Sequence, residues 1–401
     1  MRNVLTLFVM LVGKLVAQLS QTFGLGAGGT WPGEIALRIS PNILSILSSQ
    51  LKKGVILIAG TNGKTTTAKM IQIILEQNGF TVVHNASGAN LDNGIVSALI
   101  QKLDADWGVF EVDENSLPAV ARAIRQKIVV LLNLFRDQLD RYGEVDVIAE
   151  KWEKALRQRK ATIIANADDP LVAHLGINAK AKFFGIEDKS KFLPKMEHAT
   201  DSTFCLNCGA RLTYDGIYFS HLGIWRCTKC AERRPRPGIS KGTSPLPGLY
   251  NLYNTLAALG VAEILHLKAN LVNFHPAFGR QEEIGNIKIF LSKNPAGFNQ
   301  SLRTVLALGA KNLLLVLNDR IPDGRDVSWI WDVDFEMIPK GVSVRVSGDR
   351  VYDLAIRLKY AGIKATIFEN LEKALEGPLF VLPTYSAMLE VRQILKGRKI
   401  L

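Results

Sequence analysis

Short apolar runs alternate with stretches of helical period through residues 54–175. An apolar run bounded by turn residues indicates a buried strand, and a longer amphipathic stretch indicates a helix. The alternation predicts an α/β fold, in which helices cover a parallel sheet and ligands bind at the carboxyl ends of its strands. The predicted strands are 55–59, 81–84, 107–112, 128–132 and 162–166, joined by helices at 66–77 and 116–125 and by a further segment near 93–103.

The same kind of alternation begins again past residue 280 and continues to residue 382. A helix-like stretch at 253–265 resumes the first pattern after an interruption, so the interruption is an insertion in the first domain. The second pattern belongs to a separate domain. We therefore expect a helical segment at 1–40 packed on a central domain at 41–280, with an insertion at 201–236. Residues 281–401 are expected to form a smaller C-terminal α/β domain.

The N-terminus carries an apolar run of ten residues, 4–13, which ends at Lys14. Ten residues are too few to cross a bilayer core, which needs about 20. A signal peptide is an alternative, with Arg2 as a minimal basic start, but no clear small-x-small cleavage site follows. We favour a helix packed on the body of the protein or resting on the membrane face.

Composition places the chain among globular proteins, since 47% of its 401 residues are hydrophobic. That length suits two or three domains and argues against disorder or a fibrous repeat. The formal net charge of +12 predicts an anionic partner. Nucleic acid, anionic lipid and a phosphorylated substrate all satisfy this requirement, and charge alone does not choose among them.

A glycine-rich turn directly follows the first predicted strand. A strand, such a turn with Lys-Thr at its end, and then a helix form the usual cradle for a nucleotide triphosphate. Backbone N–H groups face the phosphates, the lysine reaches the β/γ oxygens, and the threonine hydroxyl can bind Mg²⁺. The turn is two residues shorter than the standard phosphate loop, so an ordinary strand-to-helix turn is the alternative. Its residues are Gly60, Thr61, Asn62, Gly63, Lys64, Thr65 and Thr66.

All four cysteines lie within the interruption of the first pattern. They form two Cys-x-x-Cys pairs separated by eighteen residues, a spacing typical of zinc ribbons: Cys205, Cys208, Cys227 and Cys230. We predict a structural Zn²⁺ site rather than disulfides, because nothing else in the sequence suggests an oxidising compartment. The intervening stretch 210–219 predicts two short strands around an Asp-Gly turn.

Six motifs, in order along about 220 residues, resemble those of the Mur ligase family. The family joins an amine to a carboxylate through an acyl phosphate made from ATP. After the phosphate loop the motifs are Glu111-Val112-Asp113-Glu114, Asn133 to Gly143, Asn166-Ala167-Asp168-Asp169-Pro170, Pro247 to Ala258 and Phe278-Gly279-Arg280-Gln281-Glu282. The resemblance implies a Mur ligase-like central parallel-sheet ATPase domain with an inserted four-cysteine zinc ribbon, followed by the smaller C-terminal domain.

The resemblance also implies roles for single residues. Mg²⁺ is expected on Thr65 and on the carboxylate of Glu111, which we place among the catalytic residues. The expected nucleotide contacts outside the phosphate loop are Asn251, Asn254, Arg280 and, beside Asn318, Asp319.

Three departures from the family pattern affect these expectations. Gln138 replaces a usual histidine, which puts a metal or phosphate role there in doubt. Lys151 stands about where many members carry a carbamylated lysine, yet an ordinary surface lysine remains the alternative. The phosphate loop begins at residue 60, which leaves no room for the UDP-sugar domain of an ordinary Mur ligase.

Three features together resemble the amidating branch of the family: the missing UDP-sugar domain, the inserted four-cysteine ribbon and the segment 323–336. That resemblance implies ATP-dependent amidation of the α-carboxyl of D-glutamate in the stem peptide of lipid II, to D-isoglutamine. Ammonia would come from a GatD-type glutaminase partner in a heterodimer. Its Cys-His pair would need an acid from this chain, and we expect Asp332, then Asp334, then Asp326.

Two other functions remain open from the sequence. One is a ligase of the Mur or folylpolyglutamate type that adds a whole amino acid. The other is a zinc-ribbon ATPase that binds nucleic acid, suggested by the net charge. We expect the amidating enzyme, with no nucleic acid partner, in the cytoplasm, and with peripheral contact at the inner face of the membrane as an open question.

Overall fold

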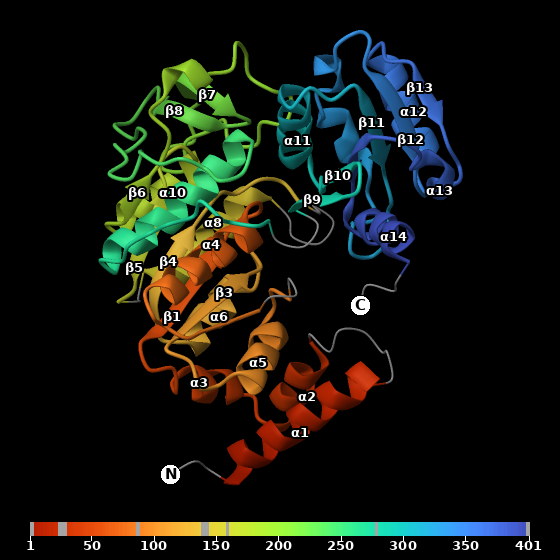
Figure 1. Cartoon of the computed structure of the whole chain (residues 1–401). Coiled ribbons are helices and arrows are strands. Elements are labelled where there is room, and N and C mark those ends of the chain that lie inside the picture. The colour runs from red at the N-terminus through yellow and green to blue at the C-terminus, as the bar shows by residue number, and fades with distance from the viewer. Residues whose placement is uncertain are drawn as a thin grey trace.

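The computed structural model describes residues 4–22, 30–85, 89–137, 144–157, 160–276 and 280–397, without the side chains of 4, 5 and 19–22. Its first sheet has six strands in the order β2-β3-β1-β4-β5-β6, and every neighbouring pair is parallel. This confirms the predicted parallel sheet (Figure 1). The strands are β1 (Gly54–Ala59), β2 (Val82–His84), β3 (Trp107–Val112), β4 (Gln126–Leu131), β5 (Thr162–Asn166) and β6 (Lys182–Phe184).

Helices cover both faces of this sheet. Successive side chains of a strand point to opposite faces, so a continuous apolar strand leaves both faces of the sheet apolar. In β1, Val55 and Leu57 join one hydrophobic core, while Ile56 and Ile58 join the other. The first core includes α5 (Asp92–Gln101), α6 (Leu117–Ala123), α8 (Val145–Leu156) and α9 (Pro170–Asn178); the second includes α4 (Lys64–Gln77) and α10 (Leu249–Ile264). The central strands are therefore buried on both sides, which explains their continuous apolar runs.

The cysteine-bearing insertion leaves the sheet after β6 and returns beside it, where Ile239 forms a parallel bridge with Phe184. It contains η1 (Lys189–Lys191) and a hairpin of β7 (Leu212–Phe219) and β8 (Leu222–Cys227). The prediction of two strands around Asp215-Gly216 was wrong. That dipeptide lies inside β7 at a shift of the register, and the reversal falls at Ser220-His221, where Ser220 has a φ of 50°. The Asp-Gly pair therefore marks a β-bulge rather than a turn.

The C-terminal sheet is mixed, in the order β13-β12-β11-β14-β10-β9, with only the β9–β10 pair antiparallel. Its strands are β9 (Arg280–Ile284), β10 (Ile287–Phe290), β11 (Asn312–Val316), β12 (Ser343–Ser347), β13 (Ala365–Ile367) and β14 (Leu379–Pro383). Its helices are α11 (Pro295–Ala307), η2 (Ser328–Asp332), η3 (Phe335–Met337), α12 (Val351–Tyr360), α13 (Leu371–Ala374) and α14 (Tyr385–Lys396). This domain faces the phosphate-loop end of the first sheet across α11 and β9 (Figure 1).

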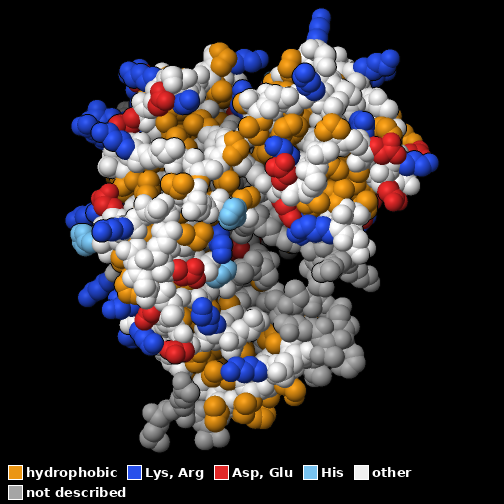
Figure 2. All heavy atoms as spheres, in the orientation of Figure 1, with side chains coloured by type: hydrophobic (Ala, Val, Ile, Leu, Met, Phe, Trp, Pro, Cys, Tyr) orange, Lys and Arg blue, Asp and Glu red, His pale blue; other side chains and the backbone are white. Residues whose placement is uncertain are grey.

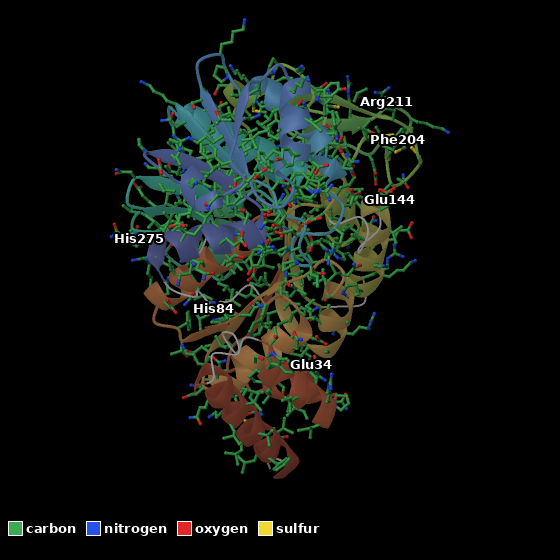
Figure 3. All side chains as sticks on the ribbon, turned by 90° about the vertical axis from the view of Figure 1, so that its right-hand side faces the viewer. Glu34, His84, Glu144, Phe204, Arg211 and His275 are labelled. Atoms are coloured by element: carbon green, nitrogen blue, oxygen red, sulfur yellow. The ribbon has the colours of Figure 1, made fainter. Side chains whose placement is uncertain are left out.

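In the part of the chain that the structure describes, three helices precede β1: α1 (Val4–Thr22), α2 (Trp31–Ile39) and α3 (Ile43–Ser48). They lie at the end of the molecule opposite the hairpin of the insertion, as the positions of Glu34 and Phe204 show (Figure 3). The side of α1 that carries Val9 and Gly13 is buried, whereas the side that carries Leu7 and Leu11 is exposed. Within the described ranges, no helix combines the length and apolar character that a membrane crossing requires.

Candidate active site

The phosphate loop lies at the carboxyl end of β1 and opens α4, as the sequence predicts. Gly63, the residue before the helix, has a φ of 92°, a conformation that favours glycine. A Cβ atom there would lie 2.1 Å from Oδ1 of Asn254, so space also excludes a larger residue. The loop and Asn254 of α10 are thus in contact, and Asn254 Nδ2 donates to Oδ1 of Asn251 at 3.2 Å.

The ammonium of Lys64 is buried and turned back on the loop. It donates to the carbonyl oxygens of Gly60 at 2.5 Å and Thr61 at 3.4 Å, and pairs with Oε2 of Glu114 at 3.1 Å. Burial alone would raise the pKa of Glu114, but Lys64 and Lys293 outweigh it, so that pKa lies below its ordinary value. A phosphate oxygen at this point would meet a lysine already desolvated and oriented.

Thr65 and Glu111 form the second polar pair of the site. The Thr65 hydroxyl donates to Oε2 of Glu111, at the end of β3, over 2.8 Å. Burial raises the pKa of Glu111, and Thr65 and Lys64 only partly offset this effect. A hydroxyl beside a carboxylate supplies the hard oxygen ligands that Mg²⁺ prefers, so these two residues fit that ion.

The segment after β4 joins the phosphate loop to the C-terminal domain. Asn133 holds the loop through a hydrogen bond from the Asn62 N–H to its Oδ1 at 2.9 Å. Asp137 forms an ion pair with the partly buried Lys293, whose pKa rises because Asp137 and Glu114 outweigh the cost of burial. Asp169 holds this segment in place, because Oδ2 of Asp169 accepts a hydrogen bond from the Leu134 N–H at 2.8 Å.

Sequence reasoning missed Lys293 and Asn294, which follow β10. Asn294 caps α11 and exchanges two side-chain hydrogen bonds with Asn62, at 3.1 and 3.2 Å. The Asn-Pro pair signals the start of a helix, but it does not show that these residues meet the phosphate loop. Arg280, the first residue of β9, also faces this region, where Glu111 partly offsets the lowering of its pKa by burial.

Other expected site residues lie elsewhere. Asp319, after β11, pairs with Arg350 at 3.1 Å within the C-terminal domain. Lys151 lies on α8 with an exposed side chain. Gln138 lies outside the described residues.

The four cysteines converge. Their Sγ atoms all lie within 4.8 Å of one another, with Cys205–Cys230 at 3.6 Å and Cys208–Cys227 at 3.4 Å. Tetrahedral thiolate coordination with metal–sulfur bonds of about 2.3 Å requires sulfurs ~3.8 Å apart, so the set fits a metal ion. N–H groups of Cys230 and Lys229 donate to Cys227 and lower the pKa of its thiol to about 6.

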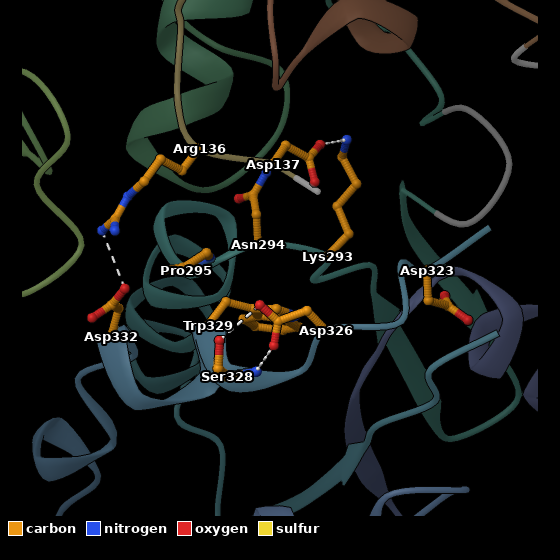
Figure 4. A pocket seen from close by; sticks show the side chains of 10 residues that line it. All are labelled: Arg136, Asp137, Lys293, Asn294, Pro295, Asp323, Asp326, Ser328, Trp329 and Asp332. Atoms are coloured by element: carbon orange, nitrogen blue, oxygen red, sulfur yellow. Dashed lines mark hydrogen bonds and ion pairs between the residues drawn. The ribbon is translucent and has the colours of Figure 1, made fainter. Parts of the chain in front are cut away.

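The three aspartates expected near a partner differ in their contacts. Both oxygens of Asp334 are engaged, by His198 at 2.6 Å and Asn299 at 2.7 Å. Both oxygens of Asp326 bind Ser328, at 2.8 and 2.9 Å. Asp332 has a side chain that is 38% exposed and binds Nη2 of Arg136 through Oδ2 at 3.1 Å. It lines a cavity of about 100 Å³ between the two domains, together with Arg136, Asp137 and Lys293 (Figure 4).

Comparison with known proteins identifies this arrangement. Residues 58–262 match the Mur ligase middle domain, and residues 291–388 match the MurT ligase C-terminal domain. The fold resembles a pseudomurein peptide ligase type C from Methanothermus fervidus, with a TM-score of 0.70 and 24% identity over 88% of this chain and 80% of that one. It also resembles folylpolyglutamate synthase from Mycobacterium tuberculosis, with a TM-score of 0.58 and 17% identity over 88% and 95%. The chain belongs to the Mur ligase family.

Within that family its relatives are more specific. The chain is 33% identical to the MurT subunit of glutamine-hydrolysing lipid II isoglutaminyl synthase from Staphylococcus aureus (strain COL), over 89% of this chain and 88% of that subunit. It is 32% identical to the subunit from Streptococcus pneumoniae (strain ATCC BAA-255 / R6), over 94% of both. It is thus a MurT subunit of this synthase, a component of a Mur-type ATP-dependent ligase.

Proposed function

We propose that the chain uses ATP to phosphorylate the α-carboxylate of D-glutamate in the lipid II stem peptide and that ammonia then displaces the phosphate to leave D-isoglutamine. The observation that carries this proposal is the convergence of Lys64 and Glu114 from the central domain with Lys293 from the C-terminal domain. Two negatively charged reactants can approach only where cations cancel their charge. Lys64 and Lys293 supply that charge at the domain junction.

Each group has a distinct role in this proposal. Lys64 and the loop N–H groups bind the β- and γ-phosphates, and Asn254 and Asn251 contact the nucleotide. Thr65 and Glu111 hold Mg²⁺, which when bound neutralises phosphate charge. Lys293 and Arg280 stabilise the charge that develops on the transferred phosphoryl group.

An isotope experiment tests the acyl phosphate. Lipid II carrying ¹⁸O in the D-glutamate α-carboxylate is incubated with the complex, ATP and glutamine, and the released phosphate is analysed by mass spectrometry. We expect ¹⁸O in the phosphate, because the carboxylate oxygen that attacks ATP leaves with it. Phosphate without ¹⁸O alongside amidated product would contradict this mechanism.

We also assign the acid of the partner's glutaminase site to Asp332. Its side chain is partly exposed, and no described residue donates to its Oδ1, whereas Asp334 and Asp326 use both oxygens. Beside it, the half-exposed Trp331 packs edge-on against Tyr360, with ring centroids 5.5 Å apart. Exposed aromatic side chains are enriched where proteins dock, which supports a GatD-type partner at this surface.

The metal at the cysteine cluster is proposed to be a structural Zn²⁺, since four thiolates leave no open position for catalysis. We expect Cys227→Ser to lose its one bound zinc and to destabilise the insertion by several kcal/mol, because structural zinc contributes roughly 10 kcal/mol or more to small modules. Metal analysis and thermal unfolding measure these effects. Nucleotide binding should persist, and its loss in a folded, zinc-free variant would contradict a purely structural role.

We propose that the exposed apolar side of α1 contacts the membrane that holds lipid II. Leu7, Phe8, Leu11 and Leu15 are 49–60% exposed at helical spacing, and residues 4–22 contain Lys14 but no acidic residue. Hydrophobic side chains are visible at this end of the molecule (Figure 2). An apolar helix face with a basic residue suits an anionic bilayer surface.

Vesicle binding tests this surface. We expect Leu7→Ser with Leu11→Ser to weaken binding to phosphatidylglycerol vesicles roughly 10- to 100-fold, from the loss of buried apolar area. Val272→Ser is the matched control, because Val272 is 83% exposed but lies on another part of the surface. Equal binding by the double variant and the control would contradict this assignment.

Magnesium dependence should respond to pH through Glu111. Only the ionised carboxylate binds Mg²⁺, and burial raises the pKa of Glu111. Magnesium affinity should therefore fall on acidification, beginning at a higher pH than for an ordinary glutamate. Magnesium titrations of ATP turnover at several pH values measure this, and Glu111→Gln should remove that pH dependence along with most of the affinity. A pH-independent affinity in the wild-type chain would contradict the role of Glu111.

A further inference from the structure

The ion pair between Arg136 and Asp332 joins the central and C-terminal domains at the carboxylate that we assign to the partner's glutaminase site. Arg136 belongs to the segment after β4 in the central domain, and Asp332 ends η2 in the C-terminal domain. Figure 4 shows the two side chains reaching toward each other across the cavity. The contact uses only Oδ2 of the carboxylate, and no described residue donates to Oδ1.

Arg136 is itself firmly held. Its Nε pairs with Oδ1 of Asp201, and its backbone N–H donates to Oδ2 of the same carboxylate at 2.9 Å. The side chain of Asp201 is only 5% exposed, so this anchor is shielded from water. Because the guanidinium is planar, holding one of its edges on Asp201 also fixes the direction in which its other N–H groups can bind a second carboxylate.

The segment that carries Arg136 also contacts the phosphate site. Thr61 of the loop accepts the Phe135 N–H at its Oγ1 over 3.0 Å, and Asp137 pairs with Lys293. Arg136 therefore lies between two residues that contact the nucleotide and phosphoryl region.

We propose that Arg136 is a positioning residue for glutamine hydrolysis in the partner, because it binds Oδ2 of Asp332 and so aims Oδ1 at the partner's histidine. This inference rests on the assignment of Asp332 under Proposed function. In a catalytic triad the carboxylate orients the imidazole and stabilises its protonated form, and it performs this role only when its own orientation is fixed. Arg136 fixes that orientation from the synthetase domain.

The test uses the assembled complex of the chain with its glutaminase partner. We expect Arg136→Ala to lower kcat for glutamine hydrolysis roughly 10- to 100-fold, the loss of one charge-assisted hydrogen bond, with KM for glutamine unchanged. Arg136→Lys should recover part of kcat, because it restores the charge without the fork geometry. Complex formation, measured by size-exclusion chromatography, should persist in both variants.

The matched control is Arg303→Ala. Arg303 forms another ion pair between the C-terminal domain and the insertion, with Glu197 at 2.8 Å, but does not touch Asp332. It should retain nearly full kcat. Equal losses in Arg136→Ala and Arg303→Ala, or a kcat for Arg136→Ala within twofold of wild type while Asp332→Asn is inactive, would overturn the positioning role alone. Full glutamine hydrolysis by Asp332→Asn would overturn the assignment of Asp332 together with the inference built on it.

Discussion

Lys64→Met should reduce ATP-dependent amidation about 10²- to 10³-fold, the usual effect of removing one preorganised group that stabilises developing charge. The lysine is 8% exposed and already oriented by two loop carbonyls and Glu114, so its charge is preorganised at the loop. The initial rate of phosphate release in the presence of lipid II and glutamine measures the effect.

The variant has a second consequence that requires a control. Removing one partner of a buried ion pair leaves an uncompensated charge and typically costs about 3–5 kcal/mol. Lys64→Met should therefore lower the free energy of unfolding as well, because Glu114 is 5% exposed. The double variant Lys64→Met with Glu114→Gln should recover stability but not activity. Recovery of both would show that Lys64 is needed for folding rather than for catalysis.

Asp332→Asn should lower glutamine hydrolysis by the complex by a factor on the order of 10⁴, the effect of replacing the carboxylate of a catalytic triad by an amide. The amide cannot stabilise a protonated histidine and presents a donor where an acceptor is needed. ATP binding should remain intact, because Asp332 binds Arg136 rather than the phosphate loop.

Asp334→Asn is the informative companion to this variant. Asp334 is two residues away, but both of its oxygens bind groups within the chain, His198 and Asn299. We expect it to affect stability more than glutamine hydrolysis. If Asp334→Asn is inactive and Asp332→Asn is active, the assignment of the two residues is reversed.

Much of the central fold follows from local sequence. The predicted strand 107–112 coincides with β3, and 55–59 lies within β1, because buried parallel strands require continuous apolar runs between polar turns. Strand β9 was not predicted, since Gln281, Glu282 and Glu283 give it no apolar run. It is an antiparallel edge strand, where burial does not dictate composition.

Some residues of the candidate site could likewise be predicted from the sequence, and others could not. Lys64, Thr65 and Glu111 could be named because motif order assigns them, and the structure brings Thr65 and Glu111 into contact. Lys293 and Asn294 could not, because their meeting with Asp137 and Asn62 depends on how two separate sheets pack. The choice among the three aspartates likewise required knowing which carboxylate oxygens are already engaged.

One measurement tests the central claim most directly. The chain is co-expressed with its glutaminase partner, purified and incubated with lipid II, and the stem peptide is analysed by tandem mass spectrometry. We expect the mass change from carboxyl to carboxamide at the D-glutamate α-position, only when ATP, Mg²⁺ and glutamine are all present. Unchanged lipid II with a bound and hydrolytically active glutaminase would contradict the account.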